Sequence, residues 1–72
     1  MKTIIDVRTP EEFSTGNVQG SINIPLQIIH LKVDEIKVMK KPIVLCCASG
    51  NRSGQAVNFL KNLGVECSNG GS

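Results

Sequence analysis

Residues 47–53 (CASGNRS) hold the residue types from which a reactive thiolate can be built. Cys47 follows an apolar run and precedes residues 55–63, whose apolar side chains recur at helical spacing. Gly50 permits a backbone path that other residues avoid, so the N–H groups of the loop can point inward and bind an anion. The N-terminus of the following helix and Arg52 add positive charge. We therefore expect Cys47 to ionise below the ordinary thiol pKa of about 8.5 and the loop to bind an anionic substrate.

A purely structural role for this loop is the alternative interpretation. Cys47 would then be a small apolar residue at the end of a strand, and Arg52 would be a solvated charge. The combination of Gly50, Arg52 and Ser53 with the cysteine at these spacings favours chemistry. The loop has no obvious general base, but a preformed thiolate needs none. The one histidine, His30, lies in a stretch with helical spacing and is expected at the surface.

The length and composition predict one small domain in the cytoplasm. The chain has 72 residues, no Trp or Tyr and two Phe, so aliphatic side chains must form the core. Its net charge of +2 comes from scattered lysines and arginines, which does not indicate nucleic-acid binding. No stretch approaches the roughly 18 apolar residues of a membrane span, and the N-terminus lacks the apolar region of a signal peptide. Three cysteines cannot all pair within the chain, so we expect free thiols in a reducing compartment.

Apolar patterns predict strands and helices that alternate along the chain. Alternation of this kind gives an α/β fold, in which a parallel sheet has helices on both faces. Ligands of such sheets bind at the carboxyl ends of the strands, where the loop after Cys47 lies. We expect strands at residues 3–7, 21–25, 43–46 and 65–67, helices at 10–16, 26–39 (one or two) and 53–63, and a loop at 68–72.

The segment before the second predicted strand contains a helix start with a capping box. Thr9 is the expected N-cap, and Glu12 is the acidic residue that completes the box. Phe13 is expected to point this short helix at the core. Arg8 is expected to pair with Glu12 or Asp6 and so to tie the helix to the sheet.

The other two cysteines have mainly structural interpretations. Cys46 and Cys47 are neighbours on a strand and must point to opposite sides, so we expect Cys46 in the core. Cys67 is expected to be buried or at the boundary of the core. A role for Cys67 as a resolving thiol requires that its strand lies beside the loop.

Four segments of the chain match ordered sequence motifs. Residues 5–13 (IDVRTPEEF), 20–25 (GSINIP), 47–53 and 69–71 (NGG) resemble I-D-V-R-x-x-x-E-(F/Y), G-A-x-N-I-P, C-x-x-G-x-R-S and G-G. These are motifs of the rhodanese-like sulfurtransferases, and the chain is similar to their minimal single-domain type, found among the phage-shock sulfurtransferases. The resemblance implies one domain over residues 1–72, with a three-layer α/β/α fold and a small, mainly parallel sheet of about four strands.

By this resemblance Cys47 is the catalytic nucleophile. It attacks the sulfane sulfur of thiosulfate or of a persulfide donor, and the sulfur passes from a Cys47 persulfide to cyanide or a thiol. The implied partners are thus a small anionic sulfur donor and a thiol or cyanide acceptor, without nucleic acid, membrane, cofactor or metal. Asp6 and Arg8 are implied as supporting residues. The implied substrate-binding residues are Ala48, Ser49, Gly50, Asn51, Arg52 and Ser53.

Two other functions remain open. Related cell-cycle phosphatases and arsenate reductases use a longer C-x5-R loop that fits a tetrahedral oxyanion, whereas Cys47 and Arg52 are spaced as C-x4-R. The shorter loop favours attack on sulfur over attack on phosphorus. The third function is a non-catalytic binding module with the same fold; such modules often lose the cysteine, which this chain keeps.

The chain also departs from the family pattern. Members usually have a further strand and helix before the first motif and a helix after the last, an aromatic residue where Cys46 stands, and often a histidine at the position of Asn17. Without the additional ends, sheet edges and apolar surface would be exposed. We therefore expect either a chain truncated at both ends or a homodimer that covers those edges.

Overall fold

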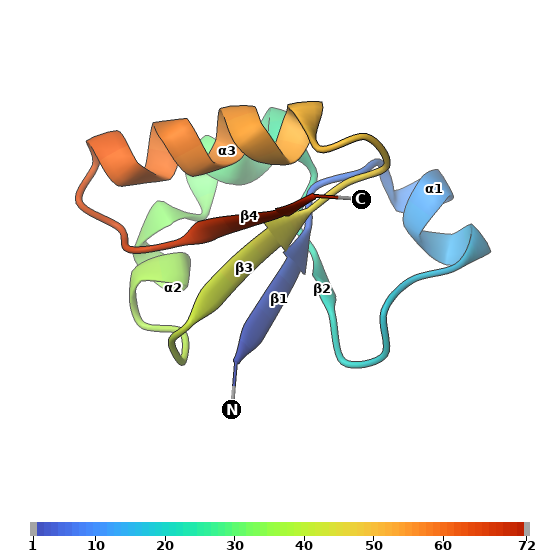
Figure 1. The fold of residues 1–72 in the computed structure, drawn as a ribbon, viewed down its shortest axis with the longest axis horizontal. Coiled ribbons are helices and arrows are strands. Elements are labelled where there is room, and N and C mark those ends of the chain that lie inside the picture. The colour runs from blue at the N-terminus through green and yellow to red at the C-terminus, as the bar shows by residue number, and fades with distance from the viewer. Residues whose placement is uncertain (1, 72) are drawn as a thin grey trace.

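The computed structural model describes residues 2–71, in which strands and helices alternate (Figure 1). The segment from residue 26 to 39 forms two helices, as the spacing of its apolar residues allowed. Within residues 2–71, no helix has both the length and the apolar character that a membrane crossing requires. In chain order the elements are β1 (Thr3–Asp6), α1 (Pro10–Thr15), β2 (Ile22–Asn23), the 3-10 helix η1 (Leu26–Leu31), α2 (Val33–Lys37), β3 (Ile43–Cys46), α3 (Asn51–Asn62) and β4 (Ser68–Gly71).

The four strands form one parallel sheet in the order β2-β1-β3-β4. The central pair is in register from Thr3 opposite Ile43 to Asp6 opposite Cys46. All carboxyl ends therefore lie at one edge of the sheet, and the loop after β3 leaves from the middle of that edge (Figure 1). The predicted α/β fold with a small parallel sheet is confirmed.

The core lies between one face of the sheet and the helices η1, α2 and α3. Because side chains alternate along a strand, Ile5 and Leu45 point to this face and are fully buried, packed in one cluster with residues of all three helices. Ile4, Val44 and Cys46 point to the other face and are only half-buried. The prediction that Cys46 is a core residue is therefore wrong, because the helices that bury its neighbours cover the opposite face.

The capping box that the sequence predicts is present at the start of α1. The Thr9 hydroxyl accepts a hydrogen bond from the backbone N–H of Glu12, whose carboxylate accepts one from the N–H of Thr9. The prediction that Phe13 reaches the core is wrong: it is half-buried and α1 has no buried residue. The reason is position, since this six-residue helix lies apart from the sheet face, beyond the strand ends (Figure 1).

The last strand lies later in the sequence than the apolar pattern predicts. β4 is Ser68–Gly71 and not residues 65–67, so residues 68–71 of the expected C-terminal loop are strand, while residue 72 lies outside the described residues. Small residues allow this close pairing, since a Cβ on Gly70 would come within 2.7 Å of the Val44 Cγ1. The backbone N–H of Cys47 donates to the carbonyl of Gly71 at 3.1 Å, so β4 also reaches the loop.

Candidate active site

Strand β3 places Cys47 at the carboxyl edge of the sheet, directly before the turn into α3. Gly50 has a φ of 90° in this turn, a value that favours glycine. It is also the N-cap of α3 and offers no side chain to the first helical turn. The N–H groups of that turn, which a capping side chain would usually bind, are therefore available to the sulfur. The helix begins at Asn51, two residues before the predicted start.

Two backbone N–H groups of the loop donate to the Cys47 sulfur. The Sγ lies 3.0 Å from the N of Gly50 and 3.3 Å from the N of Ser53, and only 5% of the residue is exposed. The N–H of Asn51 instead points to the Ser49 Oγ at 3.4 Å, so the loop amides do not all converge as the sequence suggests. The structure thus brings together Cys47, Gly50 and Ser53, whereas Ala48, Ser49 and Asn51 lie exposed on the outer side of the loop.

These donors set the ionisation of the thiol. Burial raises the pKa of Cys47, but the hydrogen bond with the Ser53 hydroxyl, in which either group can be the donor, and the backbone N–H groups of the loop outweigh it. With all of these bonds made, the pKa of Cys47 falls from 9.0 to about 7. A large thiolate fraction near neutral pH is what a cysteine nucleophile requires.

The Arg52 guanidinium is held by α1. Its two terminal nitrogens donate to the Glu12 carboxylate at 2.7 and 2.9 Å, in a bidentate pair between residues 40 positions apart. These hydrogen bonds from Arg52, followed by those from Thr9, lower the pKa of Glu12 to about 2. The same carboxylate closes the capping box, so α1, the loop and α3 meet at one acidic side chain. Binding of a substrate anion by Arg52 stays a prediction.

Asp6 and Arg8 form a second pair, beside the loop at the end of β1. The Arg8 Nε and one terminal nitrogen donate to the Asp6 carboxylate at 3.0 and 2.7 Å, and the same terminal nitrogen donates to the Gly16 carbonyl. Burial raises the pKa of Asp6, but the bonds from Arg8 outweigh it and the pKa is lowered. Arg8 thus ties the end of α1 to the sheet through Asp6, one of the two partners that the sequence suggests.

Sequence reasoning missed Asn69 of β4. Its Oδ1 lies 2.7 Å from the Ser53 Oγ, and its Nδ2 donates to the Gly50 carbonyl at 3.1 Å. Asn69 follows the two loop residues that it contacts by 16 and 19 positions, and no local pattern links them. Only the pairing of β4 with β3 brings its amide to the loop.

Cys46 and Cys67 have different relations to the site. A cavity of about 260 Å³ lies beside the loop on the outer face of the sheet, where Cys46 lines it. The lining residues of this cavity are Asp6, Arg8, Asn17, Val18, Cys46, Cys47 and Ala48.

Cys67 is buried as expected, and its Sγ is 3.9 Å from the Val57 carbonyl. It precedes β4 and so lies next to the start of β3, roughly 10 Å or more along the strands from Cys47. A resolving role for Cys67 is therefore not supported.

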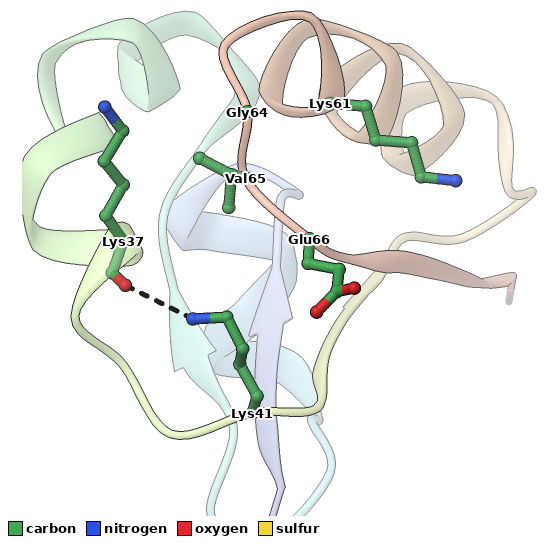
Figure 2. Close-up of a pocket in the computed structure, with 6 residues that line it drawn as sticks. All are labelled: Lys37, Lys41, Lys61, Gly64, Val65 and Glu66. Carbon is green, nitrogen blue, oxygen red and sulfur yellow. Dashed lines mark hydrogen bonds between the residues drawn. The ribbon is translucent and has the colours of Figure 1, made fainter.

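A larger cavity of about 490 Å³ lies at the amino ends of β3 and β4, away from Cys47. Lys37, Lys41 and Lys61 line it, which suggests an anion site. Figure 2 shows otherwise: the ammonium groups of Lys37 and Lys61 point away from each other, and that of Lys41 points to the Lys37 carbonyl at 3.4 Å. Within residues 2–71, no group of three or more metal-binding side chains is placed to hold a metal ion.

Comparisons with known proteins identify the family and the fold of the chain. The family described as the rhodanese-like domain matches residues 1–71. The chain is 39% identical over 61 residues to the thiosulfate sulfurtransferase PspE of Escherichia coli, covering 83% of this chain and 59% of that protein. It is 41% identical over 61 residues to the uncharacterized protein YqhL of Bacillus subtilis, covering 85% and 48%.

A solved structure shares the fold. The rhodanese-related protein of Thermoplasma volcanium has a TM-score of 0.86 and 39% sequence identity, over 99% of this chain and 71% of that chain. The chain spans about half the length of the curated relatives named above. The family match nevertheless extends over nearly every residue, and the chain belongs to the rhodanese-like domain family.

Proposed function

We propose that the chain is a sulfurtransferase that carries sulfur as a persulfide on Cys47. The observation that carries this proposal is the position of the Cys47 sulfur, 3.0 and 3.3 Å from the backbone nitrogens of Gly50 and Ser53 at the start of α3. The named relatives include a thiosulfate sulfurtransferase. The donor is thiosulfate or a persulfide, and the acceptor is cyanide or a thiol.

In the first step the Cys47 thiolate attacks the outer, sulfane sulfur of thiosulfate. A bond forms between the Cys47 sulfur and the sulfane sulfur, and the bond within thiosulfate breaks. Sulfite leaves with the electron pair, and the persulfide anion remains on Cys47. No proton must move, because the nucleophile is already a thiolate. The low pKa of Cys47 supports this step at neutral pH.

In the second step the acceptor attacks the terminal sulfur of the persulfide. Cyanide takes the sulfur and becomes thiocyanate, and the Cys47 thiolate is the leaving group. A thiol acceptor reacts in the same way as its thiolate and becomes a persulfide. The N–H groups that bind the thiolate receive the returning charge, so the same donors serve both steps.

The loop must also offset repulsion between a thiolate and an anionic donor. Arg52 contributes less than a free guanidinium would, because Glu12 neutralises it at 2.7 Å. Backbone N–H groups and the N-terminus of α3 therefore supply most of the positive potential. We further propose that donor and acceptor are small molecules, that the protein acts in the cytoplasm, and that a homodimer or additional chain covers the sheet edges.

The test is the intact mass after incubation with thiosulfate, followed by thiocyanate formation on addition of cyanide. We expect a mass gain of one sulfur atom on Cys47 and its loss when cyanide is added. Cys47→Ser should show neither, whereas the matched variant Cys46→Ser should show both.

Equal thiocyanate formation by the Cys47→Ser variant would contradict the proposal. Stable sulfur loading with little thiocyanate would identify a persulfide carrier that transfers to a thiol. Hydrolysis of an aryl phosphate or reduction of arsenate by the unloaded protein, lost in Cys47→Ser, would instead support the phosphatase or arsenate reductase alternative.

A further inference from the structure

The amide of Asn69 is held in one orientation by two backbone groups. Its Oδ1 accepts from the N–H of Gly71 at 2.9 Å, and its Nδ2 donates to the carbonyl of Gly50 at 3.1 Å. Rotation of the amide by half a turn would place a donor against the N–H and an acceptor against the carbonyl. The atom that faces Ser53 is therefore an oxygen, which can only accept a hydrogen bond.

The Ser53 hydroxyl has one proton and three possible acceptors. Its Oγ lies 2.7 Å from the Asn69 Oδ1, 3.2 Å from the Gly50 carbonyl oxygen and 3.3 Å from the Cys47 Sγ. Donation to Asn69 is the shortest of the three bonds and has the usual length for a hydroxyl donor. It is also the only bond available between these two oxygens, because Asn69 has no proton to give from Oδ1. Ser53 is fully buried, so no solvent competes for its proton.

We propose that Asn69 is a positioning residue of the Cys47 site: it takes the one proton of the Ser53 hydroxyl and so turns an oxygen lone pair, not a proton, toward the sulfur. This inference rests on the proposed function, since it concerns the resting state of the same nucleophile. It also gives β4 a part in the site that its short, small-residue sequence does not suggest.

The consequence concerns the balance between thiol and thiolate. The neutral thiol can donate to the Ser53 oxygen and complete a chain of bonds from Cys47 through Ser53 to Asn69. The thiolate has no proton to give, and it gains a bond from Ser53 only if the hydroxyl leaves Asn69. Asn69 thus favours the thiol and opposes part of the effect of the backbone N–H groups. Removing the Asn69 oxygen should make Cys47 more acidic.

Replacement of Asn69 by alanine leaves the other charged or titratable groups near the Cys47 sulfur unchanged. They come from β1 and the segment after it, from α1, from β3 and from α3, while β4 brings no titratable side chain. A shift caused by Asn69 therefore does not report on a changed ion pair. The charged or titratable groups are Asp6, Arg8, Glu12, Cys46 and Arg52.

The experiment is the pH dependence of Cys47 alkylation by iodoacetamide, with Cys47 resolved from the other cysteines by peptide mass. The variants are Asn69→Ala and Asn69→Asp, each in the wild-type chain and in the Ser53→Ala chain. We expect Asn69→Ala to increase the acid dissociation constant of Cys47 about tenfold, the effect of one hydrogen bond to a charged group. A water that enters the space can donate as well as accept, so it does not fix the direction of the Ser53 proton.

In the Ser53→Ala chain the same substitution should leave the constant unchanged, because the effect passes through the Ser53 proton. Asn69→Asp keeps the acceptor and adds negative charge, which by itself makes Cys47 less acidic. If the alanine variant does not fold, the proposal is tested by the part of this effect that disappears in the Ser53→Ala chain, and an equal effect in both chains would overturn it. An unchanged or less acidic Cys47 in folded Asn69→Ala, or an equal effect without Ser53, would overturn the proposal. The readout uses no sulfur donor, so the proposed function can fail while this inference holds, and the reverse.

Discussion

The adjacent thiols Cys46 and Cys47 belong to opposite faces of one strand and have opposite surroundings. Cys47 is buried, yet two backbone N–H groups reach its sulfur and its pKa is lowered. Cys46 is more exposed, yet burial and the nearby Asp6 carboxylate raise its pKa. Hydrogen-bond donors at a helix N-terminus, and not access to water, therefore lower the pKa of a thiol in this fold.

The same two faces differ in packing. Ile5 points to the face that η1, α2 and α3 cover and is fully buried, while its neighbour Ile4 points to the other face and is half-buried. Stability therefore comes mainly from the face to which Cys47 belongs. The helices that form this layer of the core include α3, whose first turn holds the loop after Cys47.

The largest expected effect separates these two isoleucines. Ile5→Ala should lower the free energy of unfolding by about 2–5 kcal/mol, because it leaves a cavity in a closed core. Ile4→Ala removes the same atoms from a half-buried site, where water can replace them, and should cost less than half as much. Urea denaturation at low temperature measures both. Equal losses would mean that the outer face is as well packed as the inner one.

The second expected effect separates the two thiols. At pH 7 Cys47 should react with iodoacetamide roughly 50-fold faster than Cys46, since a pKa below the ordinary value gives much more thiolate than one above it. The rate for Cys47 should level off below pH 9.0. Peptide mass spectrometry over a pH series assigns each site. Faster labelling of Cys46, which its greater exposure alone would predict, would reverse the comparison.

A third effect concerns Gly70, which approaches the outer face. Gly70→Ala should destabilise the protein by about 1–3 kcal/mol, because the new methyl group would lie 2.7 Å from the Val44 Cγ1. Val44→Ala in the same chain should recover part of that loss. Gly16→Ala is the matched control, since a Cβ there has no atom within 4 Å. Thermal unfolding compares the four proteins, and a cost without recovery would mean that the clash is with the backbone of β3.

The smallest effect distinguishes the two ion pairs. Glu12 and Asp6 both have lowered pKa values, so each stabilises the fold above its unfolded pKa and loses this contribution as the pH falls through the folded value. For Glu12 that window runs from its ordinary pKa of 4.5 to about 2. Glu12→Gln should slightly flatten the acid dependence of the urea midpoint. Asp6→Asn should change it less, because burial of the Asp6 carboxylate raises its pKa and opposes the hydrogen bonds from Arg8.

Several features could be predicted because they depend on neighbouring residues. The capping box of Thr9 and Glu12 is local, and the structure has it. The order of strand, glycine turn and helix around Cys47 is also local, because it depends only on the periodicity of the apolar residues and on the conformational freedom of Gly50. The amino acid sequence by itself thus determined the parallel α/β order and the place of the candidate nucleophile at a strand end.

Contacts between distant residues were decided by the tertiary structure. The position of β4 could not be read from Ser68–Gly71, whose small residues have low strand propensity and pair only because β3 allows close approach. The same pairing brings Asn69 to Ser53, and the packing of α1 brings Glu12 to Arg52. The helices cover the face of the sheet to which Cys47 points, so Cys47 is a core residue and Cys46 is half-buried. Alternation along the strand places the two side chains on opposite faces, but it does not determine which face the helices cover.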